Sequence, residues 1–203
     1  MSPERTVYVV DDDPAVRRSL ERLLDSAGLH VITYETSLAF LEAAPNLASG
    51  CALLDVRMPG MDGLELQALL RQRNFPLPVI VMTGQGDVQS AVRAMKAGAV
   101  DFIEKPYGDD ILLDAIEAAL SRVHGADIGR DTTEAAERIA TLTRRERQVL
   151  DALVMGCPNK VIAFDLGISI RTVEVHRARM MERLGVRQLG EAVRLAVLAR
   201  MDS

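Results

Sequence analysis

The sequence predicts an α/β doubly wound (βα)5 parallel-sheet domain, followed by a small all-α domain of four helices. Two observations carry this prediction. Five short apolar runs alternate with segments that repeat apolar residues at helical spacing, which is the pattern of a parallel sheet with crossover helices. After residue 140 the apolar residues keep the helical spacing, and no further strand pattern appears.

The charge divides the chain at the same place. Residues 1–124 carry 11 Lys and Arg against 18 Asp and Glu, a net charge of −7, whereas residues 141–203 carry 11 against 7, a net of +4. An acidic first half and a basic second half predict two domains, the second of which could meet nucleic acid. We place the first domain at 1–124, a linker at 125–140 and the second domain at 141–203. The linker is expected to be a flexible or semi-flexible tether, partly helical from Thr133 to Ala140.

The predicted strands of the first domain are runs of β-branched and apolar residues bounded by turn residues. They are Thr6–Val10, His30–Tyr34, Cys51–Leu54, Pro78–Met82 and Val100–Ile103. The helices between them begin at residues that suit a cap or a first turn and often stop at glycine. Pro14 and Ser37 open the first two, Leu64–Leu70 is the core of the third, Asp87 caps a fourth from Val88 to Ala97, and Asp109 or Asp110 starts a fifth through Leu120.

Polar residues follow four of these strands, and open α/β sheets hold their ligands at the carboxyl ends of the strands. Asp11 and Asp12 follow the first strand, and Asp55, Thr83 and Lys105 follow the third, fourth and fifth. Clustered carboxylates repel one another, so we expect a divalent cation there, and oxygen ligands favour Mg²⁺. The cation would neutralise charge on a transferring phosphoryl group. Lys105 and Thr83 can hold phosphate oxygens, so we predict that Asp55 accepts a phosphoryl group.

Other interpretations of the same residues stay open at this point. The aspartates could cap the helices that follow them, Thr83 could be a strand-end hydroxyl and Lys105 a surface charge. An enzyme alternative is a phosphatase resembling the haloacid dehalogenases, whose nucleophile would be an aspartate after the first strand. That pattern needs Thr or Val at residue 15, where this chain has Ala15, and it leaves Asp55 unexplained.

The composition excludes several classes of protein. No apolar stretch approaches the roughly 20 residues of a transmembrane helix, and the N-terminus lacks a signal-peptide pattern, so we expect a cytoplasmic protein with no membrane contact. Cys51 and Cys157 lie far apart in the sequence and are expected to be reduced thiols. His30, His124 and His176 are scattered without ligand spacing, which argues against a zinc site.

The second domain is predicted to contain a helix-turn-helix. Thr143 and Glu146 have the spacing of a capping box at the start of its first helix. The four helices are expected to run from Thr143 to Gly156, from Pro158 to Gly167, from Ser169 to Leu184 and from Gln188 to Arg200. The turn Leu166-Gly167-Ile168-Ser169 between the second and third helices resembles that of a helix-turn-helix motif.

The helix after Ser169 has two distinct faces. At about 100° per residue, Val173, Met180 and Leu184 share an apolar face. The opposite face carries Arg171, Val175, Ala178 and Glu182, flanked by Glu174 and Arg179. This second face could enter the major groove of DNA, with the two arginines making polar contacts and Val175 meeting a thymine methyl group. Arg177 projects nearer the apolar face, where it could reach a phosphate or pair with a carboxylate.

The preceding helix could touch the DNA backbone at its start. The residues expected at DNA are therefore Asn159, Lys160, Ser169, Arg171, Thr172, Glu174, Val175, Arg177 and Arg179. One alternative is a charged, solvated helix face without a ligand. Another is a module that binds protein or RNA.

Both halves of the chain resemble known families. Residues 5–122 resemble a two-component receiver domain through VVDDD, LLDVRMPGMDG, VIVMTG and AMKAGAVDFIEKP, in that order. Residues 141–200 resemble a LuxR-type DNA-binding domain through LTRRERQVLDALVMGCPNKVIAFDLGISIRTVEVHRARMMERLGV. The whole chain is similar to response regulators of the FixJ type, in the NarL/FixJ family, through GQGDVQSAVRAMKAGAVDFIEKPY and RTVEVHRARM.

The resemblance implies a role for each residue of the strand-end cluster. Asp55 would be the phosphoacceptor, and Asp11 and Asp12 would form the acidic pocket. The implied Mg²⁺ ligands are Asp12, Asp55 and the backbone carbonyl of Arg57. The implied switch residues are the Thr83 hydroxyl and the Phe102 aromatic ring, with Lys105 followed by a cis peptide to Pro106. From the sequence alone, Phe102 could equally be a core residue.

The resemblance also implies the partners. A cognate sensor histidine kinase would donate the phosphoryl group, and promoter DNA and RNA polymerase would be the targets. The phosphorylated chain would form a homodimer through the face of residues 88–104. No enzymatic activity is implied beyond Mg²⁺-dependent self-phosphorylation and self-dephosphorylation. Glu174 and Ala178 depart from the positively charged base contacts of many family members, so the operator sequence does not transfer.

Overall fold

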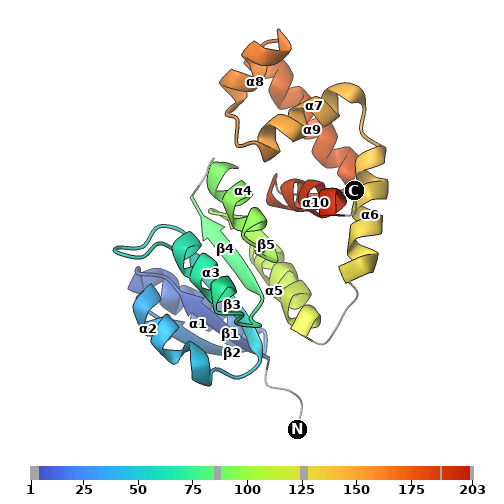
Figure 1. The fold of residues 1–203 in the computed structure, drawn as a ribbon. Helices are drawn as coiled ribbons and strands as arrows, with labels where there is room; N and C mark the ends of the chain where they lie inside the picture. The colour runs from blue at the N-terminus through green and yellow to red at the C-terminus, as the bar shows by residue number, and fades with distance from the viewer. Residues whose placement is uncertain (1–4, 85–87, 124–127, 188, 202–203) are drawn as a thin grey trace. The chain divides into compact units, whose positions relative to one another are not determined.

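The computed structural model describes residues 5–84, 88–123, 128–187 and 189–201 (Figure 1). These residues form two compact units. The first unit comprises residues 5–84 and 97–123, and the second comprises residues 88–96 and 128–201. The predicted helix cap Asp87 lies outside the described residues.

The first unit is built on a five-stranded parallel sheet with the order β2-β1-β3-β4-β5. The strands are β1 Thr6–Val10, β2 His30–Tyr34, β3 Gly50–Asp55, β4 Val79–Thr83 and β5 Asp101–Glu104. All five predicted strands are confirmed, and the ends of three of them are shifted by one residue. β4 begins after Pro78, because proline has no N–H for the ladder, although the Pro78 carbonyl accepts the N–H of Ala52 at 2.8 Å.

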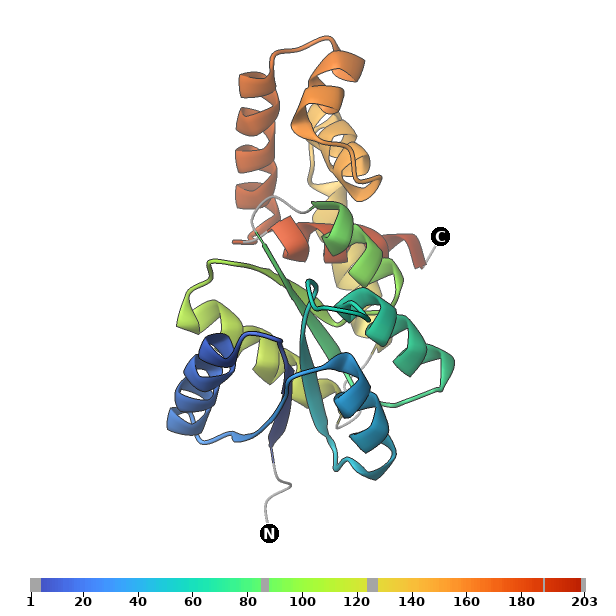
Figure 2. The ribbon, with the colours of Figure 1, turned by 90° about the vertical axis from the view of Figure 1, so that its left-hand side faces the viewer.

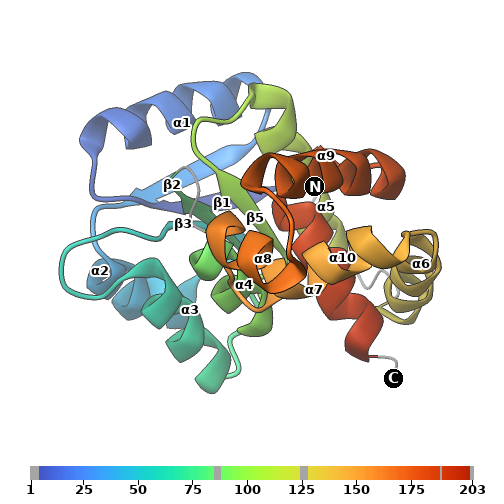
Figure 3. The ribbon, with the colours of Figure 1, turned by 90° about the horizontal axis from the view of Figure 1, so that it is seen from above.

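Helices cover both faces of this sheet, as a doubly wound fold requires. They are α1 Pro14–Ser26, α2 Ser37–Ala43, the 3₁₀ turn η1 Ala44–Asn46, α3 Gly63–Gln72 and α5 Asp109–Val123. Val7 and Val9 of β1 belong to the core that α1 and α5 form on one face. Tyr8 between them points to the opposite face and contacts Phe40 of α2, with ring centroids 6.2 Å apart. Figure 3 shows α1 on one side of the sheet and α2 and α3 on the other.

The second unit is entirely helical. Its helices are α4 Val88–Lys96, α6 Ile128–Ala140, α7 Arg144–Val154, α8 Asn159–Leu166, α9 Ile170–Leu184 and α10 Leu189–Met201. The predicted capping box at Thr143 and Glu146 is present on α7, and Ser169 caps α9 as predicted. Figure 2 shows α8 and α9 side by side, joined by a short turn, which is the predicted helix-turn-helix.

The segment predicted as a tether contains a longer helix than expected. α6 begins at Ile128, before the predicted start at Thr133, and it packs against α10. Ala135 and Ile139, four residues apart on one face of α6, are 0% and 3% exposed. This part of the segment is therefore a packed helix.

Two expectations from the composition can be compared with the structure. None of the described helices is long and apolar enough to cross a membrane. Cys51 and Cys157 are both free thiols, as predicted, and burial raises the pKa of Cys51 to about 12.

Candidate functional site

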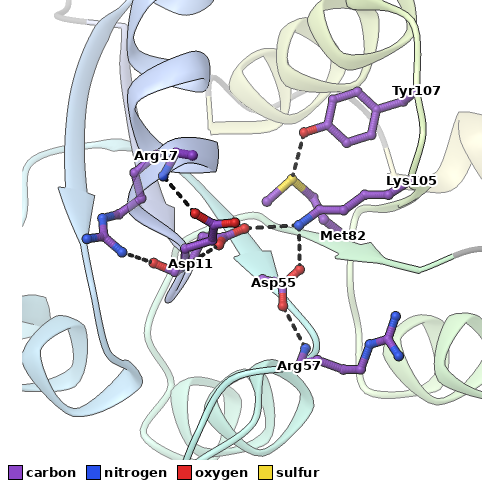
Figure 4. A network of polar contacts seen from close by, with 9 residues as sticks. Asp11, Arg17, Asp55, Arg57, Met82, Lys105 and Tyr107 are labelled. Atoms are coloured by element: carbon purple, nitrogen blue, oxygen red, sulfur yellow. Dashed lines mark hydrogen bonds and ion pairs between the residues drawn. The ribbon is translucent and has the colours of Figure 1, made fainter.

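An ammonium group lies between two carboxylates at the carboxyl edge of the sheet (Figure 4). Lys105 Nζ is 2.6 Å from Oδ1 of Asp55 and 3.0 Å from Oδ2 of Asp11. Asp11 directly follows β1, Asp55 ends β3 and Lys105 directly follows β5. The two carboxylate residues are only 2% and 7% exposed. The structure thus brings together three residues that the strand-end pattern predicted.

Burial and charge act in opposite directions on this cluster. Burial raises the pKa of Asp55 above its ordinary value, and the nearby Asp11 charge adds to this, whereas Lys105 and the backbone N–H of Arg57 lower it by less. Burial alone would lower the pKa of Lys105, but hydrogen bonds and charges from Asp55 and Asp11 raise it overall. Lys105 therefore stays charged at neutral pH, and it partly compensates the Asp55 carboxylate, whose charged form burial disfavours.

The turn after β1 holds Asp11 in place. The Asp13 N–H donates to Asp11 Oδ1 at 2.9 Å, and Arg17 Nη1 donates to the Asp11 carbonyl at 2.6 Å. Neither Asp11 nor Asp12 caps α1, because Asp13 is the N-cap residue and accepts a backbone N–H of the first turn. Asp12 is exposed.

Thr83 and Phe102 are both buried. Thr83 ends β4 with 1% exposed, and its carbonyl accepts the N–H of Lys105 at 2.7 Å. Phe102 lies in β5 with 4% exposed. Its burial is consistent with both the switch and the core interpretation. The peptide bond between Lys105 and Pro106 is cis, as expected.

The oxygen donors at this edge fit Mg²⁺. In the described part of the chain, no three or more His, Cys, Asp or Glu side chains are grouped so as to hold a metal ion. Mg²⁺ does not need such a group, because it commonly binds one or two carboxylates and keeps several waters. The buried carboxylates of Asp11 and Asp55 already accommodate one cationic group, the ammonium of Lys105. The Arg57 backbone carbonyl and the exposed Asp12 are the further predicted donors.

The backbone passes very close beneath the acceptor. A Cβ atom on Gly63, the first residue of α3, would overlap the carbonyl oxygen of Asp55. The N–H of Gly63 also donates to the carbonyl of Val56 at 3.1 Å. Only glycine allows this approach, so Gly63 helps to place the end of β3.

Three side chains at this edge were not among the predicted site residues. The Arg57 guanidinium lies over Gly84, where a Cβ atom would overlap it. Arg17 holds the turn after β1, and Tyr107 donates its hydroxyl to the sulfur of Met82 at 3.5 Å (Figure 4). Arg17 is five residues after Asp12, and Tyr107 is two residues after Lys105. Their closeness in the sequence did not identify them, because only the folded backbone turns them toward the site.

The second predicted site is α9. Val173, Met180 and Leu184 are buried, which confirms the predicted apolar face. Arg171, Glu174, Val175, Ala178, Arg179 and Glu182 are all exposed, which confirms the opposite face. Val175 lies among these charged side chains with 42% of its surface exposed.

Other residues predicted at DNA take part in contacts within the motif. Ser169 caps α9 by accepting the N–H of Thr172 at 3.1 Å, and the two hydroxyls lie 2.8 Å apart. Arg177 Nη1 donates to Oδ1 of Asn159 at 3.0 Å. Its partner within the chain is therefore an amide, whereas a phosphate or a carboxylate was expected. Lys160 is exposed.

Comparisons with known proteins cover both units. A family model described as "Response regulator receiver domain" matches residues 7–117, and one described as "Bacterial regulatory proteins, luxR family" matches residues 140–196. The "Transcriptional regulatory protein FixJ" of Azorhizobium caulinodans is 52% identical over 196 residues, which cover 95% of this chain and 92% of that protein. The protein of the same name from Bradyrhizobium diazoefficiens is 47% identical over 202 residues, which cover 99% and 98%.

Solved structures give the same picture. Full-length FixJ from B. japonicum superposes with a TM-score of 0.59 at 47% identity, covering 98% of this chain and 99% of that one. The response regulator StyR superposes with a TM-score of 0.57 at 44% identity, covering 96% and 98%.

Proposed function

The chain belongs to the response regulators of the FixJ type, and we propose that phosphorylation of Asp55 by a cognate sensor histidine kinase controls the binding of α9 to promoter DNA. The family comparisons show that the chain is a transcriptional regulator with a receiver domain and a LuxR-type DNA-binding domain. Because the first domain belongs to the receiver family, the alternative of a phosphatase resembling the haloacid dehalogenases is set aside. We place the receiver at 1–124, the linker at 125–140 and the DNA-binding domain at 141–203, in a cytoplasmic protein.

The contact of Lys105 with both Asp55 and Asp11 is the observation that supports this proposal most strongly. In the proposed transfer, a carboxylate oxygen of Asp55 attacks the phosphorus atom, the P–N bond of the donor phosphohistidine breaks, and the imidazole leaves. Arg57 contributes its backbone N–H, which donates to Asp55 Oδ2 at 2.7 Å and orients the acceptor. Mg²⁺ held by Asp11, Asp12, Asp55 and the Arg57 carbonyl would supply positive charge that offsets the charge of the transferring group.

The modified Asp55 would carry new charge and strong acceptor oxygens. We propose that Lys105 pairs with one of these oxygens and that the Thr83 hydroxyl donates to another. Movement at Thr83 would then be passed to Phe102 and to the surface of residues 88–104. That surface would form the homodimer, release the DNA-binding domain, or do both.

The exposed face of α9 would then enter the major groove. Arg171, Arg179 and Val175 are proposed to contact bases, and Lys160 to contact a phosphate. Glu174 also lies on this exposed face. RNA polymerase is the proposed partner at the promoter.

The test is to label the purified chain with acetyl phosphate in the presence and absence of Mg²⁺, and to compare wild type with Asp55→Asn by intact mass. We expect one phosphoryl group on wild type, only with Mg²⁺, and none on the variant. Binding to duplex DNA should increase on phosphorylation of wild type alone. Equal labelling of the variant would contradict the proposal.

A further inference from the structure

We propose that Arg177 acts on DNA through Asn159: its guanidinium fixes the Asn159 amide so that Nδ2 donates to a backbone phosphate. This inference rests on the proposed function, since it assumes that the motif of α8 and α9 binds duplex DNA. It makes Arg177 a positioning residue and assigns the contact with DNA to Asn159.

The contact between the two residues has only one possible polarity. Arg177 Nη1 lies 3.0 Å from the amide of Asn159, across the interface of α8 and α9. A guanidinium has five N–H donors and no acceptor. The amide must therefore present Oδ1 to Arg177, and its Nδ2 group then points away from the guanidinium.

The Nδ2 group is the part of this pair that is left for a ligand. Among the described residues, Asn159 Nδ2 has no hydrogen-bond partner. Asn159 is the first residue of α8 and half-buried, and the exposed Lys160 follows it. An amide donor beside a lysine is suited to a phosphate oxygen, because both groups donate to an anion.

The position of Arg177 on α9 argues against a direct contact with bases. Its neighbours Val173 and Met180, four residues before and three after it, belong to the buried face of α9. Arg171, Val175 and Arg179 occupy the exposed face. Arg177 is itself half-buried, and its guanidinium is directed to the start of α8.

The test measures binding of the full chain, phosphorylated with acetyl phosphate and Mg²⁺, to a random-sequence duplex by fluorescence anisotropy over a series of NaCl concentrations. A random duplex is sufficient because phosphate contacts do not depend on the sequence. Asn159→Ala and Arg177→Ala should each weaken binding about tenfold, and the double variant should also lose about tenfold because the two residues form one contact. Thermal unfolding of each variant checks that the helices remain folded.

Two further variants sharpen the result. Asn159→Asp keeps an acceptor for Arg177 but replaces the donor with a carboxylate oxygen, so it should bind even more weakly than Asn159→Ala. Lys160→Ala is the control for a charged phosphate contact, and it should make the slope of log K against log [NaCl] less negative by about 0.9. Asn159→Ala removes a neutral donor and should leave that slope unchanged.

The outcomes separate this inference from the proposed function. If the single losses multiply to about a hundredfold in the double variant, Arg177 contacts DNA independently and the inference is overturned. Binding of Asn159→Asp as tight as wild type would also overturn it. If the wild-type chain does not bind duplex DNA at all, both the proposed function and the inference fall.

Discussion

Lys105 and Asp55 are joined by a contact of 2.6 Å between Nζ and Oδ1, and burial disfavours the charge of both residues. The ammonium stays charged because two carboxylates face it. The acceptor carboxylate is nevertheless harder to ionise than a carboxylate in water. The site thus holds a residue whose charged form costs folding stability.

Asp55→Asn is therefore expected to stabilise the protein at neutral pH. The raised pKa of Asp55 means that its contribution to stability is present at pH values below the ordinary aspartate pKa and is lost as the pH rises through the raised value. Asparagine removes the ionised form that carries this cost. Thermal unfolding at pH 7.5 should show a higher melting temperature for the variant. The difference should shrink as the pH falls toward the ordinary aspartate pKa of about 4. A lower melting temperature at pH 7.5 would mean that the lost pairing with Lys105 outweighs burial.

Gly63→Ala is expected to disturb the acceptor through the backbone. The new Cβ atom would overlap the carbonyl oxygen of Asp55, so the start of α3 or the end of β3 must move. Urea unfolding should show a loss of about 3 kcal/mol, and labelling by acetyl phosphate should slow. The matched control is Gly60→Ala, where a Cβ meets nothing within 4 Å and the cost comes from φ of +81° alone. That control should lose about 1 kcal/mol and label at the normal rate.

Ile139→Ala tests whether α6 is a structural helix or a tether. Ile139 is 3% exposed and α6 packs against α10, so the truncation should leave a cavity and cost about 2–4 kcal/mol in urea unfolding. Glu137 is exposed on the same helix, and Glu137→Ala should change stability by less than about 0.5 kcal/mol. Equal stability of the two variants would restore the tether interpretation.

The strand ends were predictable because a parallel sheet brings them to one edge whatever the helices between them do. This is why Asp11, Asp55 and Lys105, from distant parts of the sequence, are found together. The choice among three consecutive aspartates was not predictable. Each suits a helix cap, and only the path of the turn after β1 selects Asp13 as the cap and buries Asp11.

Contacts between helices were harder to predict from the sequence. The hydrogen bond of Arg177 to Asn159 joins residues 18 positions apart and depends on how α8 packs on α9. Ala135 and Ile139 gave only a weak helical signal in a polar segment, because their burial requires α10 as a partner. Helical periodicity identifies a buried face but not the element that covers it.

Glu146→Gln separates the charge of a buried carboxylate from its capping role. Glu146 is 3% exposed, and in the capping box of α7 its Oε2 accepts the Thr143 N–H at 2.9 Å. The same Oε2 lies 3.2 Å from Arg183 Nε. Burial would raise the pKa of Glu146, but the hydrogen bonds of Thr143 and the charge of Arg183 lower it overall. Glutamine can still accept the Thr143 N–H, so the variant loses mainly the pairing with Arg183.

The lowered pKa of Glu146 gives the pH dependence of this effect. Its contribution to stability is fully present above the ordinary glutamate pKa and is lost as the pH falls through the lowered value. Glu146→Gln should therefore cost about 1 kcal/mol at pH 7, a value discounted because the Arg183 side chain is 47% exposed. The cost should be smaller at about pH 4, just below the ordinary glutamate pKa. Urea unfolding at the two pH values measures both numbers. A cost that is the same at both pH values would show that Glu146 acts through its shape and hydrogen bonds, with no contribution from its charge.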